Sequence, residues 1–204
     1  VPLYFGQLVG LQSRTSFTST GSRIVYQSSG ERGFVTIGFL RATSAIIDLS
    51  NLQLFLRPPG VGRRAIIGPA LRAIGLAEIP MHGAPGRLFF VDGEINGVSG
   101  KMAVDTGATV TVLDRQFASQ VKARGGGMKI QQGDAGGNFR ETDVVYVQSF
   151  KLGGVSVYRP DITVANTSLA SYGLLGVIGM DVLGQNRSII DCGERKLYLA
   201  PVRR

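Results

Sequence analysis

Short apolar stretches separated by turn residues run along most of the second half of the chain. Their alternation predicts β-strands over residues 88–95, 101–104, 110–113, 144–147, 150–152 and 155–157. Asn96-Gly97 lies between the first two and is a strong signal for a tight hairpin, because both residues tolerate positive φ. Gly153-Gly154 predicts a second turn. The pattern therefore predicts a mainly β fold.

Helical signals are few and short. Pro69 suits the first position of a helix, and Asp114 is a candidate N-cap for a helix over residues 115–121. Phe117 and Val121 would share one face of that helix. Residues 125–143 are rich in glycine and polar side chains, so we expect a mobile loop there. One or two short helices thus complete the predicted fold.

The chain contains an internal repeat. Residues 44–58 align without gaps on residues 187–201, an offset of 143 residues. Each copy contains Ile-Ile-Asp, then alternating leucines and a closing proline, which is the pattern of a β-hairpin. A weaker sequence similarity aligns Val1-Pro2-Leu3 with Ile79-Pro80-Met81. We therefore expect the first copy to keep both ends of a half-domain and to lack its middle.

The repeat and the distribution of breaker residues divide the chain into three predicted segments. Residues 1–58 form a degenerate half-repeat, and residues 59–76 form a linker that opens with proline and glycine. Residues 77–204 form the main domain, which is mostly β.

Composition supports a folded protein and excludes several classes. Of the 204 residues, 44% are hydrophobic and 18% charged, which argues against intrinsic disorder. No apolar run reaches the roughly twenty residues of a spanning helix, so we expect no membrane span. The single Cys192 and single His82 can form neither an internal disulfide nor a Cys/His zinc site, so no metal or cofactor is expected.

The net charge of +8 raises the question of polyanionic partners. The basic residues are dispersed, and no basic run is interleaved with aromatic residues. We interpret the charge as a solvated surface and expect no nucleic-acid partner, since that function rests on charge alone.

The candidate chemistry lies at residues 103–113, Ala-Val-Asp-Thr-Gly-Ala-Thr-Val-Thr-Val-Leu. Asp105-Thr106-Gly107, flanked by predicted strands, places a carboxylate on a tight turn where glycine permits close backbone approach. Three such residues also occur in ordinary connecting turns. On this motif alone a structural turn and an acid site both stay open.

Two further features accompany this motif. Residues 177–183 read Val-Ile-Gly-Met-Asp-Val-Leu, and a hairpin is predicted over residues 189–199. Together with the run from Val104 to Ala108 after the Asn96-Gly97 hairpin, they make residues 77–204 resemble the retropepsin-like aspartic proteases, the retroviral-type fold and its bacterial relatives. By the same likeness, residues 1–58 resemble the remnant of a preceding repeat that lacks Asp-Thr-Gly.

The resemblance implies an acid-protease barrel and a set of site residues. Asp105 would be catalytic, Thr106 would brace the paired turns and Gly107 would allow close approach. Substrate-binding positions implied by the resemblance are Ala108, Gly133, Asp134, Ala135, Gly136, Gly137, Val177 and Ile178. Five of these lie in the stretch 131–138, which we interpret as a flap that closes over substrate; an ordinary flexible loop is the alternative.

The implied reaction is hydrolysis of peptide bonds by an aspartic endopeptidase acting on a peptide or protein substrate. It needs two carboxylates that share one proton, whereas the sequence has a single Asp-Thr-Gly. The twin of Asp105 would therefore come from another chain in a homodimer. The alternative is a noncatalytic binding or dimerisation module in which Asp105 is idle.

The remaining acidic residues have structural interpretations. Asp181 precedes a short helical pattern and is expected at a helix start. Asp48 and Asp191 occupy equivalent positions of the repeat, which favours a role in turns. Cys192 stands where the first copy has Leu49, so we expect a small buried residue rather than a nucleophile.

Overall fold

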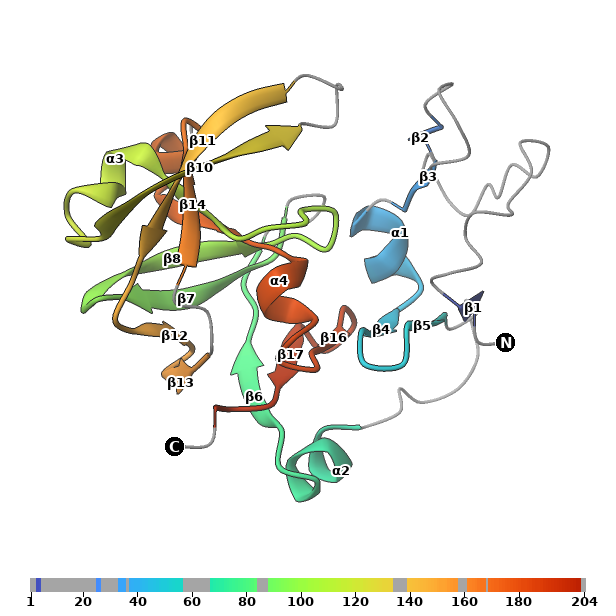
Figure 1. Cartoon of the computed structure of the whole chain (residues 1–204). Helices are drawn as coiled ribbons and strands as arrows, with labels where there is room; N and C mark the ends of the chain where they lie inside the picture. The colour runs from blue at the N-terminus through green and yellow to red at the C-terminus, as the bar shows by residue number, and fades with distance from the viewer. Residues whose placement is uncertain are drawn as a thin grey trace. The chain divides into compact units, whose positions relative to one another are not determined.

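The computed structural model describes residues 3–4, 25–26, 33–35, 37–56, 67–83, 88–133, 139–157, 161–167 and 169–202 (Figure 1). The chain divides into two compact units. One comprises Val1–Leu88 with Arg187–Ala200, and the other comprises Phe89–Asn186 with Pro201–Arg204. The first unit thus combines the two copies of the hairpin repeat, whereas the second contains the Asp-Thr-Gly motif. The predicted division at residues 58 and 76 follows the sequence repeat and stays a prediction.

The described part of the first unit contains a six-stranded antiparallel sheet. Its strand order is β1 (Leu3–Tyr4), β5 (Gln53–Phe55), β4 (Ile46–Asp48), β16 (Ile189–Asp191), β17 (Lys196–Leu199) and β6 (Ala77–Pro80). The predicted hairpins of the repeat are β4–β5 and β16–β17, and both are confirmed. Helix α1 (Ile37–Ala42) precedes β4. Helix α2 (Gly68–Ala73) begins at Gly68, one residue before the predicted start at Pro69. Strands β2 (Val25–Tyr26) and β3 (Gly33–Phe34) form a separate pair.

The two hairpins meet at the centre of this sheet. Strand β4 pairs with β16 so that Ile47 lies opposite Ile190. The backbone N–H of Leu49 donates to the carbonyl of Ser188 at 3.0 Å, and beyond the other end of the ladder the N–H of Cys192 donates to the carbonyl of Ala45 at 2.9 Å. The two copies of the hairpin are therefore joined by one continuous antiparallel ladder.

The predicted alignment of residues 1–3 on residues 79–81 is wrong. Leu3 lies opposite Leu54, and Ile79 lies opposite Leu197, the repeat equivalent of Leu54. Leu3 therefore corresponds to Ile79 rather than to Met81. The shift is two residues, which keeps the same face of a strand, so a sequence pattern of period two does not distinguish the two alignments.

The second unit contains a nine-stranded sheet among its described residues. Its order is β10 (Arg124–Gly133), β11 (Phe139–Tyr146), β14 (Asp161–Ala165), β9 (Val112–Asp114), β15 (Leu174–Ile178), β8 (Val98–Val104), β7 (Phe90–Ile95), β12 (Phe150–Leu152) and β13 (Val155–Ser156). Its short helices are α3 (Arg115–Ala118), the 3-10 helix η2 (Leu169–Tyr172) and α4 (Met180–Leu183). The predicted mainly β fold with short helices is confirmed.

The turn residues behave as predicted. Asn96 and Gly97 have φ of 48° and 83° and join β7 to β8, and Gly153 and Gly154 have φ of 54° and 81° between β12 and β13. Residues with little penalty at positive φ therefore determine where these strands reverse.

The expected mobile loop over residues 125–143 is wrong for most of its length. β10 and β11 form a long hairpin from Arg124 opposite Tyr146 to Gly133 opposite Phe139. In β11, Thr142 and Val144 are buried while Glu141 is exposed, so polar residues occupy one face of a half-buried strand. Residues 134–138, at the tip, lie outside the described residues. Helix α3 also ends at Ala118 rather than Val121, and the strand expected at 110–113 is β9, which begins at Val112.

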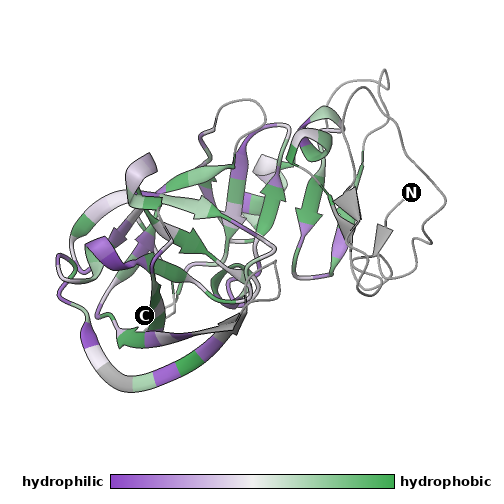
Figure 2. Cartoon of the chain, turned by 90° about the horizontal axis from the view of Figure 1, so that it is seen from above, coloured by the Kyte–Doolittle hydropathy of each residue, from purple (hydrophilic) through white to green (hydrophobic). Residues whose placement is uncertain are grey.

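Apolar positions follow the strands of both units (Figure 2). In the second unit the fully buried side chains include Phe89, Ile95, Met102, Leu113 and Ile178, and in the first they include Ile79, Leu197 and Leu199. Each unit therefore has an apolar core of its own. Among the described helices, none has the length and apolar character needed to cross a membrane.

Candidate active site

The Asp-Thr-Gly loop is positioned by the strand order of the second unit. Strands β8 and β9 are consecutive in the chain, yet β15 lies between them in the sheet, parallel to β8 and antiparallel to β9. The chain that leaves β8 therefore passes beyond the end of β15 before it enters β9. Residues 105–111 form that connection, and Asp105 is its first residue.

Hydrogen bonds hold the start of this loop. The N–H of Asp105 donates to the carbonyl of Ile178 at 3.1 Å, at the end of β15. The N–H of Gly107 donates to Oδ1 of Asp105 at 2.8 Å, and that of Ala108 to the Asp105 carbonyl at 3.3 Å. The Asp105 side chain is half-buried. Its carboxylate is thus oriented by its own turn and is still reachable from solvent.

Two glycines of β15 and its end allow the loop to lie close. A Cβ at Gly176 would stand 2.0 Å from the carbonyl oxygen of Val112. At Gly179 it would stand 2.5 Å from the carbonyl of Val110 and 2.9 Å from that of Ala108. Any side chain at these positions would displace the backbone that carries the loop. This explains why Val-Ile-Gly accompanies Asp-Thr-Gly in the sequence.

A second set of bonds joins the loop to helix α4, and we call it the Thr111–Asp181 latch. Thr111 donates its N–H to Oδ2 of Asp181 at 2.9 Å and its hydroxyl to Oδ1 at 2.7 Å. The same hydroxyl accepts the N–H of Gly179 at 3.1 Å. Thr111 is completely buried, so these partners satisfy groups that water does not reach.

The latch includes a residue that sequence reasoning missed. Asp181 lies in the first turn of α4, as expected, but Gly179 is the N-cap and the Asp181 carboxylate bonds to Thr111. Thr111 was not singled out. The available signal was a hydroxyl residue within the apolar run from Val110 to Leu113, where a buried polar side chain needs a partner.

Asp114 is a structural carboxylate, as predicted. It caps α3 by accepting the N–H of Gln116 at 3.0 Å, and it accepts the hydroxyl of Thr167 at 2.6 Å and the N–H of Leu169 at 3.1 Å. Burial alone would raise the pKa of Asp114, but these hydrogen bonds outweigh it and the pKa is lowered. The residue is therefore a charged anchor for η2 and not a free acid.

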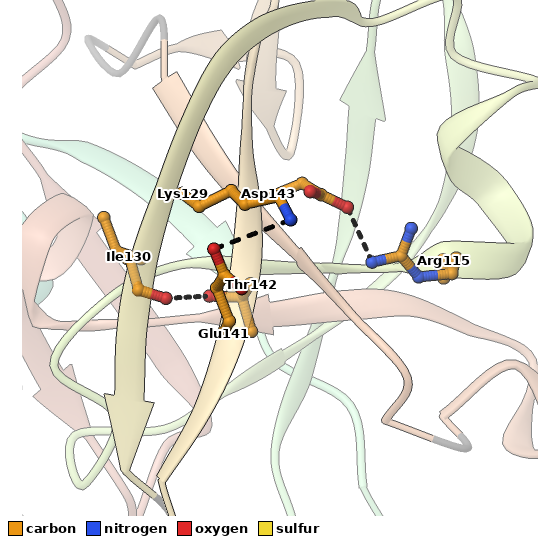
Figure 3. Close-up of polar contacts among 6 residues, drawn as sticks. All are labelled: Arg115, Lys129, Ile130, Glu141, Thr142 and Asp143. Carbon is orange, nitrogen blue, oxygen red and sulfur yellow. Dashed lines mark hydrogen bonds and ion pairs between the residues drawn. The ribbon is translucent and has the colours of Figure 1, made fainter.

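The β10–β11 hairpin carries the predicted flap. At its base, Arg115 of α3 contacts Asp143 of β11 at 2.8 Å (Figure 3). Further along, the Thr142 hydroxyl donates to the Ile130 carbonyl at 3.2 Å, and Lys129 pairs with Glu141 at 3.5 Å. Gly133 ends β10. Asp134, Ala135, Gly136 and Gly137 lie outside the described residues, so closure of a flap stays a prediction.

The structure brings most of the other predicted positions together at one end of β15. Thr106, Ala108 and Val177 are half-buried, whereas Gly107 is exposed. The Ile178 side chain is completely buried, and this residue serves the loop through its carbonyl rather than by facing a substrate. Within the described residues, no group of three His, Cys, Asp or Glu side chains could hold a metal ion.

Cys192 is buried in the first unit, as predicted. Burial, together with the neighbouring Asp191 carboxylate, raises the pKa of its thiol to about 12. The thiol is therefore protonated at neutral pH and is not a nucleophile.

Comparison with known proteins gives one family. Residues 91–182, a little under half of the chain, match the family described as aspartyl protease. The match contains the whole Asp-Thr-Gly loop, β15 and the latch. It confirms the resemblance to the retropepsin-like aspartic proteases and supports a peptidase. No curated protein matches the chain.

Two solved structures are similar to parts of the chain. EIAV protease complexed with the inhibitor HBY-793 is 24% identical over 51% of this chain and 92% of its own, with a TM-score of 0.39. A retropepsin-like aspartic protease from Rickettsia conorii is 19% identical over 62% of this chain and 94% of its own, with a TM-score of 0.46. Both TM-scores are low, so the assignment rests on the family match and on the loop geometry.

Proposed function

We propose, from the aspartyl protease family match at residues 91–182, that the chain is an aspartic endopeptidase in which Asp105 of two copies share one proton. The observation that carries the proposal is the Asp105 carboxylate, oriented by the Gly107 N–H at the end of β15 and still half exposed.

The proposed reaction needs no metal and no covalent intermediate. Two carboxylates about 3 Å apart cannot both ionise, so the pair holds one proton. The ionised carboxylate takes a proton from a water molecule, which attacks the peptide carbonyl carbon, and the protonated one donates to the carbonyl oxygen. On collapse, the protonated carboxyl donates its proton to the leaving nitrogen and the C–N bond breaks. The other carboxylate takes a proton from a hydroxyl of the tetrahedral species, so the pair again holds one proton.

The second copy follows from the count of motifs. The sequence contains one Asp-Thr-Gly, and its first repeat lacks it. A two-fold axis would bring Asp105 to its twin, with Thr106 bracing the paired turns and Gly107 permitting the approach. Ala108, Val177 and the hairpin tip are the proposed substrate contacts.

The experiment compares three purified proteins on an unfolded protein substrate at mildly acidic pH: wild type, Asp105→Asn and Asp114→Asn. We expect Asp105→Asn to abolish hydrolysis with an unchanged circular dichroism spectrum, because an amide cannot share the proton. Asp114→Asn is the matched control, since it also removes a carboxylate but lies outside the loop. Full turnover by Asp105→Asn would end the proposal.

A mixing experiment addresses the second copy. An excess of Asp105→Asn chains added to wild type should suppress activity by forming mixed pairs, and specific activity should rise with protein concentration. A monomer without activity at any concentration would favour the alternative, a noncatalytic binding or dimerisation module. The single motif per chain is the observation that favours this alternative.

A further inference from the structure

Strand β16 has the same sequence as the strand that pairs with it. Both β4 and β16 read Ile-Ile-Asp, at residues 46–48 and 189–191. Their ladder is centred on Ile47 and Ile190, which are equivalent residues of the repeat. An antiparallel ladder centred on equivalent residues is what two identical strands form about a two-fold axis. Within one chain, β4 therefore pairs with β16 as β16 of a second chain would.

The bonds that flank this ladder obey the same two-fold relation. Leu49 is the repeat equivalent of Cys192, and Ala45 is the equivalent of Ser188. The N–H of Leu49 bonds to the Ser188 carbonyl at 3.0 Å, and that of Cys192 bonds to the Ala45 carbonyl at 2.9 Å. Exchanging the two copies converts one hydrogen bond into the other.

The hairpin turns are equivalent as well. Oδ1 of Asp48 accepts two backbone N–H groups at 2.9 and 3.1 Å, and Oδ1 of Asp191 accepts two at 3.0 and 2.8 Å from the equivalent positions. Positive φ also recurs at equivalent residues of the two copies: Ser44 (45°) and Arg187 (52°), and Leu52 (53°) and Arg195 (53°). The first copy thus reproduces the backbone of the second through the whole hairpin.

The first copy has the strand that pairs with β16 but has no Asp-Thr-Gly loop. Ile47 is 4% exposed and Ile190 is 2% exposed, so the ladder is apolar and closed to water. In contrast, the position equivalent to Asp181 is Gly38, which cannot form the latch. The first copy therefore has the strand pairing of the second but lacks both Asp-Thr-Gly and the aspartate that supports it.

We propose that residues 37–56 are an internal stand-in for a second copy of the chain. They occupy the edge of β16 on which β16 of another chain would pair in the same register, and a second chain must displace them before the homodimer forms. The occupant of the vacated edge is a second copy because it presents the identical Ile-Ile-Asp strand. The inference rests on the proposed function, because the homodimer is part of that proposal.

The chain offers a direct way to lock the stand-in. Cys192 is its one cysteine, and it lies across the ladder from Ala45. Paired residues of antiparallel strands have Cα atoms about 5.5 Å apart, within the range of a disulfide. Ala45→Cys should therefore form an intrachain disulfide with Cys192 on oxidation. Ala45→Ser is the matched control, because it has similar size and cannot be oxidised to a disulfide.

We expect oxidised Ala45→Cys to sediment as a monomer at every concentration and to lose at least tenfold in hydrolysis. Reductant should restore both to the values of Ala45→Ser. Self-association of the locked chain equal to that of the control would overturn the proposal.

A release variant tests the opposite direction. Ile47→Pro removes the N–H of the central residue of β4 and leaves the sequence of β16 intact, so the midpoint of dimerisation should fall at least tenfold. Ile190→Pro is its control, since it impairs β16 toward either partner and should abolish dimerisation. Circular dichroism establishes that each variant is folded. Should Ile47→Pro dimerise no more readily than wild type, the stand-in is not the barrier and the proposal fails.

These readouts separate the two proposals. If the lock blocks dimerisation and release promotes it, but no form hydrolyses peptides, the pairing inference holds and the endopeptidase assignment fails. If every form is an active monomer, the two-copy site and the stand-in are both refuted, whereas peptidase activity is retained.

Discussion

Residues 37–56 and 180–199 are two copies of one local structure that differ in what they support. Both have a short helix, a strand, an aspartate-held turn and a returning strand. In the second copy, Asp181 of the helix fastens the Asp-Thr-Gly loop through Thr111. In the first, the equivalent residue is Gly38, and there is no Asp-Thr-Gly.

The difference shows that strand pairing and acid chemistry have separate requirements. A three-residue ladder with an apolar centre satisfies its own backbone bonds and needs few particular side chains. The acid loop needs partners from β15 and α4, far away in the chain. Residues 37–56 therefore complete a sheet without an acid loop.

The largest expected effect is on the free energy of unfolding, and it tests whether the two copies contribute equally to stability. Ile47→Ala and Ile190→Ala should each lower the free energy of unfolding by about 3 kcal/mol, because each removes a buried side chain at the centre of the ladder. Urea denaturation measures both. Leu52→Ala, at a half-exposed turn residue, should change it by less than about 0.5 kcal/mol. A loss confined to Ile190→Ala would show that β4 contributes little to the sheet.

The next prediction concerns the Thr111–Asp181 latch, which only the second copy has. Asp181→Asn places an amide donor against one of the two donors of Thr111, so we expect a loss of about 2 kcal/mol in stability. The proposed hydrolysis should fall with it, because the loop loses its support. A double-mutant cycle with Thr111→Val measures the coupling between the two residues. Additive losses would mean that the latch does not couple them.

A smaller difference in stability is expected between variants of the two turn aspartates. Asp191 is 3% exposed and Asp48 is half-buried, although each accepts two backbone N–H groups. Replacement by alanine should cost about 1.5 kcal/mol at Asp191 and about 0.5 kcal/mol at Asp48, since water can replace the lost acceptor only at the less buried turn. Thermal unfolding of the two variants distinguishes them, and equal losses would contradict the role of burial.

The smallest expected effect is dependent on pH. Lys196 of β17 donates to Glu78 of β6 at 2.8 Å and lowers the pKa of Glu78 below its ordinary 4.5, whereas the first copy has Gln53 in place of Lys196. A lowered pKa stabilises the fold above about pH 4.5, and this stabilisation is lost as pH falls through the folded-state value. Glu78→Gln should therefore cost about 0.5 kcal/mol at pH 7 and nothing below the folded pKa. Stability measured from pH 7 to pH 3 checks this, and a pH-independent difference would exclude the ion pair as its cause.

Features that depend on neighbouring residues could be predicted from the amino-acid order. Asn96-Gly97 specified a hairpin, Asp114 specified a helix cap, and the matched Ile-Ile-Asp segments specified two similar hairpins. Asp-Thr-Gly placed a carboxylate in a turn for the same reason, since a glycine N–H two residues away can bond to it. Local φ/ψ preferences and short side-chain bonds are sufficient for these features.

The meeting of distant segments depends on the whole fold and could not be predicted from local patterns. The fold inserts β15 between β8 and β9, joins Thr111 to Asp181 across 70 residues, and sets Ile47 against Ile190. The fold also pairs the glycine-rich residues 124–133 with β11, because a partner strand satisfies backbone groups whatever their side chains. The local preferences of residues do not determine which strand another strand pairs with. Pairing and register depend instead on the burial and hydrogen bonding of the whole fold.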